Sequence, residues 1–168
     1  MLPVSNCTPY LLSYPPGVTS TAEAHHIGTC RPTTDLPLLL ADLHLALLPG
    51  DEVRIRLDPV PDVGWTLQRA DDLLVGAGFV PDTINWCDTG RVEVAATRIR
   101  SLPDTVAPGL RLLVVGLNPS PSSADTAVGY HRGGNRFWPA VLEAGLASVD
   151  REPRHALHDH GLGMTDLV

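Results

Sequence analysis

A chain of 168 residues is long enough for one domain or for two incomplete ones. The formal net charge of −7 is unevenly spread: residues 1–105 hold seven arginines and thirteen acidic residues, whereas residues 106–168 hold five and six. The first part is therefore not where a polyanion would dock. Residues 106–168 have no basic stripe, although a local basic cluster there could still bind a polyanion.

Three cysteines, Cys7, Cys30 and Cys87, are too few and too scattered for a disulfide framework or a zinc site. We therefore expect a reduced, cytoplasmic protein without a bound metal. The chain does not begin with the charged and then apolar pattern of a secretion signal. No apolar run approaches the length that spans a bilayer, so we expect no membrane contact.

Residues 1–34 are rich in proline, threonine and serine and show no clear periodicity. The leucine-rich stretch from Leu36 to Leu48 then predicts a helix, with Thr34 or Asp35 as its N-cap. Pro49-Gly50 is expected to stop it.

A strand and a second helix are expected next. Glu52 to Leu57 alternates between apolar and charged side chains, which predicts a half-exposed strand. Trp65 to Ala77 favours a helix, because Gly78 follows its end. Thr83 to Cys87 and Arg91 to Thr97 indicate two strands paired across a turn.

This order of elements is similar to the carboxyl half of class I S-adenosylmethionine methyltransferases. The likeness is carried by Leu48-Pro49-Gly50-Asp51, Gly76-Ala77-Gly78-Phe79 and Val92 to Arg98. The glycine-rich loop that would hold the cofactor has no counterpart in the chain. We therefore interpret residues 1–105 as a methyltransferase-like remnant without a cofactor, joined to the rest by a linker at Ser101 to Gly109.

Leu112 to Leu117 is an apolar, partly β-branched run that predicts a buried parallel strand. Asn118-Pro119 must follow as a loop, because the residue before a proline is pushed out of helical geometry. Ligands of open α/β sheets bind at the carboxyl ends of the strands, so Asn118 stands where such folds usually carry out their chemistry. Gly134 to Trp138 then predicts the start of a helix, with Asn135 as its cap.

Residues 110–168 resemble the mismatch-specific uracil-DNA glycosylases, the branch that includes thymine-DNA glycosylase. The matching motifs are Gly116-Leu117-Asn118-Pro119-Ser120, Ser122-Ser123-Ala124, Tyr130, Asn135-Arg136-Phe137-Trp138, Ala144-Gly145-Leu146 and Gly163-Met164-Thr165-Asp166-Leu167-Val168. The resemblance implies an α/β fold in which residues 106–168 are the amino-terminal half of a parallel-sheet, uracil-DNA-glycosylase-like domain. It implies double-stranded DNA with a G·U or G·T mismatch as the partner, and no cofactor.

The resemblance also implies roles for single residues. Asn118 matches the residue that orients the attacking water, and Tyr130 matches the aromatic side chain that stacks on the flipped base. The backbone at Gly116 and Leu117 would offer donors to the base. Asp166 would read the base edge, where the family more often has an amide or a lysine. A carboxylate could accept the ring N–H of uracil, but it would repel an anionic leaving base unless burial kept it protonated.

Ser122, Ser123 and Arg136 are candidates for contacts with the DNA backbone. Each serine alone is better explained as a cap of its loop, and Arg136 is equally well explained as a solvated side chain. The histidines at 155, 158 and 160 do not share one face of a helix, so we expect them to be solvated and not to bind metal.

The family's second motif, which wedges into the duplex, has no counterpart, so we expect weak or absent activity from this polypeptide alone. A half sheet would also leave an exposed edge through which the chain could associate. Two alternatives stay open: a non-catalytic fragment that binds a partner and, less favoured, a methyltransferase-type enzyme.

Overall fold

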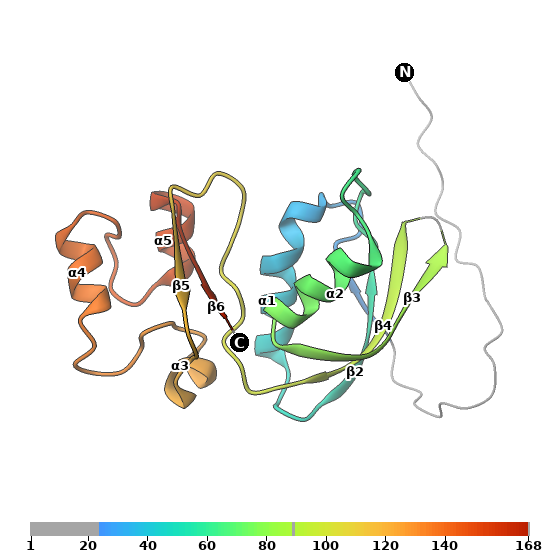
Figure 1. Ribbon diagram of the computed structural model, residues 1–168, viewed down its shortest axis with the longest axis horizontal. Helices are drawn as coiled ribbons and strands as arrows, with labels where there is room; N and C mark the ends of the chain where they lie inside the picture. The colour runs from blue at the N-terminus through green and yellow to red at the C-terminus, as the bar shows by residue number, and fades with distance from the viewer. Residues whose placement is uncertain (1–23, 89, 168) are drawn as a thin grey trace, which may run out of the picture.

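The computed structural model describes residues 24–88 and 90–167, and it shows a mixed α/β protein with two sheets (Figure 1). Cys7, Thr89, Val168 and most of residues 1–34 lie outside the described residues. The elements are β1 (His25–Ile27), η1 (Thr33–Asp35), α1 (Leu36–Ala46), β2 (Glu52–Leu57), α2 (Leu67–Gly76), β3 (Phe79–Asp88), β4 (Arg91–Arg98), β5 (Leu112–Gly116), α3 (Pro121–Thr126), α4 (Phe137–Glu143), α5 (Pro153–His160) and β6 (Leu162–Asp166). Among these elements, no helix is both long and apolar enough to cross a membrane.

The first sheet has the strand order β1-β2-β4-β3. β1 runs parallel to β2, and β4 is antiparallel to both of its neighbours. Helices α1 and α2 cover the face of this sheet that looks toward the second sheet (Figure 1). Burial alternates along β2 and β4, because every second side chain of each strand points to the face that the helices cover.

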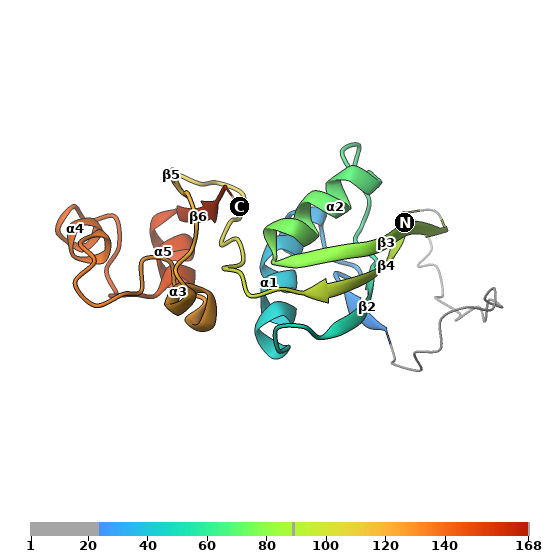
Figure 2. The ribbon, with the colours of Figure 1, turned by 60° about the horizontal axis from the view of Figure 1, so that its bottom comes forward.

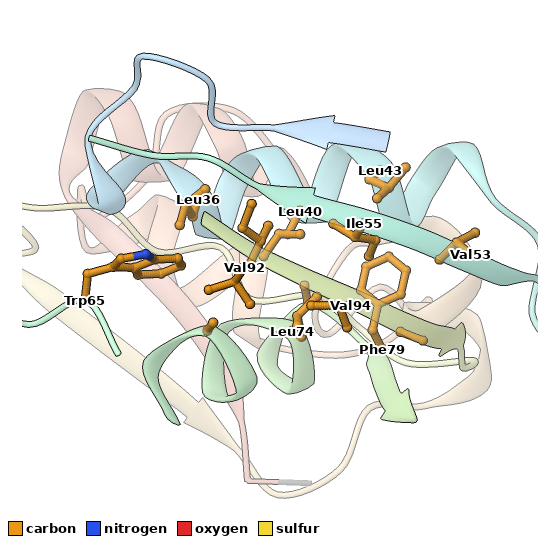
Figure 3. Close-up of a cluster of buried hydrophobic side chains, with 14 residues drawn as sticks. Leu36, Leu40, Leu43, Val53, Ile55, Trp65, Leu74, Phe79, Val92 and Val94 are labelled. Carbon is orange, nitrogen blue, oxygen red and sulfur yellow. The ribbon is translucent and has the colours of Figure 1, made fainter. Parts of the chain in front are cut away.

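A cluster of aliphatic and aromatic side chains fills the space between this sheet and its helices (Figure 3). Leu40 of α1, Leu74 of α2, Ile55 of β2 and Phe79 of β3 are each at most 1% exposed. Full burial of one such side chain contributes about 1.5–3 kcal/mol before chain entropy is counted, so this cluster is the main source of stability for the first part.

The helices and strands predicted from Leu36 onward in this part are present, but β3 begins at Phe79, four residues before the predicted Thr83, and α2 is shorter than predicted at both ends. β2 spans the predicted residues, and β3 and β4 pair as a hairpin. Helix α1 ends at Ala46, before the expected stop, and Asp35 is its N-cap residue without a side-chain cap hydrogen bond. The Asp35 carboxylate instead accepts from Arg31. Helix α2 is capped by Thr66, whose hydroxyl accepts from the Arg69 amide at 3.1 Å.

The second sheet consists of two parallel strands, β5 and β6, in continuous register. Helices α4 and α5 supply its core, in which Trp138 is fully buried and donates from its ring nitrogen to the Gly129 carbonyl at 2.8 Å. The Asn135 carboxamide accepts from the Phe137 amide at 2.8 Å, but the N-cap residue of α4 is Arg136, so the prediction of Asn135 as the N-cap is wrong by one residue.

The prediction that Leu112 to Leu117 is a buried strand is only half right. The strand is parallel, but Leu113 and Val115 are 44% and 49% exposed. Within the described residues β6 is the only strand paired with β5, and the helices lie on one side of this small sheet (Figure 2). An apolar, β-branched run therefore forms a strand here without being covered on both faces.

Backbone and ionic contacts join the two sheets. The amide of Asp104 donates to the carbonyl of Gly76 at the end of α2, and Thr105 exchanges two backbone hydrogen bonds with Met164 of β6. Arg154 of α5 contacts the Asp42 carboxylate of α1 at 2.6 Å. Helix α1 thus lies between the first sheet and α5, which fits its largely apolar sequence.

Candidate functional site

Three of the predicted site residues meet at the carboxyl ends of β5 and β6. Gly116 and Asp166 are partners in the parallel register. A Cβ atom on Gly116 would overlap the Asp166 carboxylate and would lie 3.6 Å from the Tyr130 hydroxyl. Position 116 therefore has no room for a side chain, and the absence of one lets the carboxylate and the phenol approach the strand end.

Asn118 and Leu117 lie just beyond this point and are both exposed. Pro119 and Ser120 follow, and Ser120 caps helix α3 by accepting from the Ser123 amide at 3.2 Å. The carboxamide of Asn118 is thus carried on a short loop between a strand end and a helix start. This is the place where open α/β sheets present ligand-binding groups.

Tyr130 is half-buried and has a φ of 57°, in the left-handed region that is costly for a bulky residue. Its ring stacks on Phe137 with centroids 4.2 Å apart and an interplanar angle of 23°. Phe137 in turn meets the edge of Trp138. The strained backbone is therefore held by an aromatic stack that reaches the buried core of the second sheet.

Burial raises the pKa of Asp166. Burial also raises the pKa of Tyr130, and the charge of the nearby Asp166 raises it further. The linker residue Asp104 belongs to the same group of side chains. Burial raises the pKa of Asp104, a hydrogen bond with Thr165 lowers it, and the charge of Asp166 raises it further. Burial at this strand end therefore raises the pKa of both carboxyl groups above its ordinary value.

A small pocket of about 100 Å³ adjoins these acids. Asp104 and Asp166 line it together with Val75, Gly76, Ser101, Leu102 and Leu167, so the first part of the chain contributes to its wall. Asn118 is not part of that wall. Asp104 was not among the residues singled out from sequence, because its proximity to Asp166 arises only from the path of the linker.

The two candidate serines lie in helix α3 and not in a loop as expected. The Ser122 hydroxyl is 2.8 Å from Nδ1 of His131, a histidine that the motif comparison did not single out. Ser123 is only 2% exposed, and its hydroxyl lies 3.1 Å from that of Ser120. Ser122 is thus the more accessible of the two, whereas Ser123 completes the start of the helix.

Arg136 is exposed at the start of α4, and Arg132 is exposed in the loop before it. Residues 127–142 contain these two arginines and His131 but no acidic residue. The guanidinium of Arg151 donates to the His131 carbonyl at 3.3 Å. The segment around Tyr130 is therefore locally basic in sequence, in a protein that is acidic overall.

In the part of the chain that the structure describes, no group of three or more histidine, cysteine or acidic side chains could hold a metal ion. His155 pairs with Asp159 at 2.9 Å, and His160 contacts the hydroxyl of Ser148 at 2.9 Å. No protein-family model matches the chain. Function must therefore be argued from these residues and their arrangement.

Proposed function

We propose that this protein is a DNA glycosylase of the mismatch-specific type, which hydrolyses the N-glycosidic bond of uracil or thymine opposite guanine. The observation that carries the proposal is the convergence of Gly116, Tyr130 and Asp166 at the ends of two parallel strands, with Asn118 on the next loop. Such a group of residues can hold a planar base and a water molecule beside its sugar.

In the proposed reaction the target nucleotide leaves the duplex and its base stacks on Tyr130, on the ring face opposite Phe137. Stacking of this kind contributes about 1–3 kcal/mol per base. The Asn118 carboxamide orients a water toward the sugar, whose transition state resembles an oxocarbenium ion. Since an amide cannot take the proton of that water, we expect slow turnover.

Asp166 would meet the departing base. A uracil that leaves as an anion is repelled by a carboxylate but stabilised by a neutral carboxyl group that donates a hydrogen bond. The raised pKa of Asp166 favours the neutral form and so supports this role.

The exposed arginines Arg132 and Arg136, which are close to Tyr130 in sequence, support an approach of the DNA backbone to this segment. Ser122 would add a hydroxyl to the same contact, and its hydrogen bond with His131 fixes the orientation of both groups. Ser123 is too buried to contribute. These contacts would position the duplex without reading its sequence.

Within this proposal, residues 106–168 are the amino-terminal half of a uracil-DNA-glycosylase-like domain, and residues 1–105 are a methyltransferase-like remnant. The parallel pairing of β5 with β6 supports the first assignment. The order α1, β2, α2, β3, β4 supports the second, and the missing glycine-rich loop argues against a working methyltransferase.

The proposal is tested by incubating the full chain, in excess, with duplexes containing U·G or T·G and with single-stranded uracil DNA. We expect slow base release from the mismatched duplexes and its loss in Asn118→Ala. Asn85→Ala, at an exposed asparagine of β3, is the matched control and should keep wild-type release. If DNA binds but no base is released from any substrate, the alternative of a non-catalytic binding module is favoured.

A further inference from the structure

Strand β5 has a free edge with a defined hydrogen-bonding pattern. The amide of Leu112 and the carbonyl of Gly116 bond toward β6. Because successive residues of a strand point their backbone groups to opposite sides, the N–H and C=O of Leu113 and Val115 point away from β6. No strand of the described residues accepts them on that side.

This edge has none of the features that usually block strand association. Leu112 to Leu117 contains no charge and no proline, and its register with β6 shows no bulge. Leu113, Val115 and Leu117 are 44%, 49% and 77% exposed. Leu167, which follows β6, is 70% exposed on the same sheet. An uncharged, apolar edge of this kind does not attract DNA, whose binding depends on positive charge.

We propose that the β5 edge pairs antiparallel with the β5 edge of a second copy of this chain, centred on Val114. In that register Leu113 lies opposite Val115 of the second copy, and each residue pair exchanges both of its outward backbone hydrogen bonds. The result is a four-stranded sheet in the order β6-β5-β5-β6. A sheet of two strands is only marginally stable by itself. Pairing covers the free β5 edge of each copy and buries part of the exposed apolar surface.

Charge favours the antiparallel pairing of the two β5 strands over a parallel pairing. The charged residue closest to the strand is Arg111, directly before it. In the antiparallel register Arg111 lies opposite the uncharged Leu117 of the second copy. A parallel pair related by a two-fold axis would instead place Arg111 beside its own equivalent, and like charges directly opposite are destabilising. The edge is thus complementary to itself in one orientation.

The test is the mass of the full chain in solution, measured by sedimentation velocity over about 1–200 µM, the range in which short interfaces associate. We expect the wild-type mass to rise toward twice that of the monomer. Val115→Pro should stay monomeric, because it removes an outward amide that the β5–β6 ladder does not use, and edge positions tolerate proline. The near-ultraviolet circular dichroism of buried Trp138 reports whether each variant is folded.

Two double variants form a matched pair for the register. Leu113→Lys with Val115→Lys would place like charges opposite each other and should abolish the dimer. Leu113→Lys with Val115→Glu has the same number of charged substitutions but places opposite charges across the two-fold axis, so it should retain the dimer. A wild-type chain that stays monomeric, forms only larger aggregates, or loses its dimer equally in both double variants would overturn the proposal.

Discussion

His44 should make the stability of this protein depend on pH in a way that one substitution removes. It lies in α1 with no exposed surface, its ring meets the edge of Phe79, and neither ring nitrogen reaches a partner at good hydrogen-bonding geometry. Burial, and then the nearby Arg98 guanidinium, lower the pKa of His44 from 6.5 to about 4. Backbone groups of Ser101 and Gly78 offset part of this effect.

The sign and size of the effect follow from that shift. The folded state holds His44 in its neutral form, so its contribution to stability is complete above pH 6.5 and is lost as the pH falls toward 4. One pKa unit corresponds to about 1.4 kcal/mol, so the full loss is about 3 kcal/mol, and most of it is reached by pH 4.5. That is a large fraction of the stability of a small protein.

The assay is urea unfolding at pH 7 and pH 4.5, followed by circular dichroism, for the wild type and His44→Leu. The variant has no imidazole to protonate, so its free energy of unfolding should fall by about 2–3 kcal/mol less between the two pH values. His26→Gln removes an exposed histidine of β1 and should leave the wild-type loss unchanged. An equal loss in wild type and His44→Leu would show that the buried imidazole is not the cause.

Three further predictions concern the candidate site. Gly116→Ala should lower the melting temperature, because its Cβ would overlap the Asp166 carboxylate. Adding Asp166→Ala should restore much of the lost melting temperature. No recovery in the double variant would contradict that packing. Asp104→Asn should raise the melting temperature at pH 7 but not near pH 3, because a carboxyl group with a raised pKa favours folding only while it is protonated; a gain at both pH values would point to another cause. Asn118→Asp should speed uracil release, measured in single-turnover experiments, because a carboxylate can accept the proton of the attacking water; an unchanged rate would argue against a water held at this position.

Most of the secondary structure could be predicted from local patterns in the sequence. The alternation of Glu52 to Leu57 fixes both the limits of β2 and its buried face, because the period of a strand is two residues. β1 was missed, since three residues, His25–Ile27, are too few to show a period. The short helix α3 was read as a loop because proline and serine dominate its sequence, although both residue types are common at helix starts.

Features that depend on contacts between residues far apart in the sequence could not be predicted from local patterns. The apolar content of β5 was correctly taken as a strand, but its exposure depends on what packs beside it. The proximity of Asp104 to Asp166 and of His131 to Ser122 results from how the linker and the loop before α4 fold back. Gly116 lies at the end of β5, where the apolar run of the sequence ends, and its lack of a side chain leaves room for the Asp166 carboxylate.

The most direct test of the account is the release of free uracil, measured by mass spectrometry, from a U·G duplex incubated with an excess of the full chain. We expect slow release by the wild type and none above background by Asn118→Ala, while both proteins bind the duplex equally. Equal release by the two proteins would contradict the assignment of Asn118 as the residue that orients the water, and no release by either would contradict the proposed glycosylase activity itself.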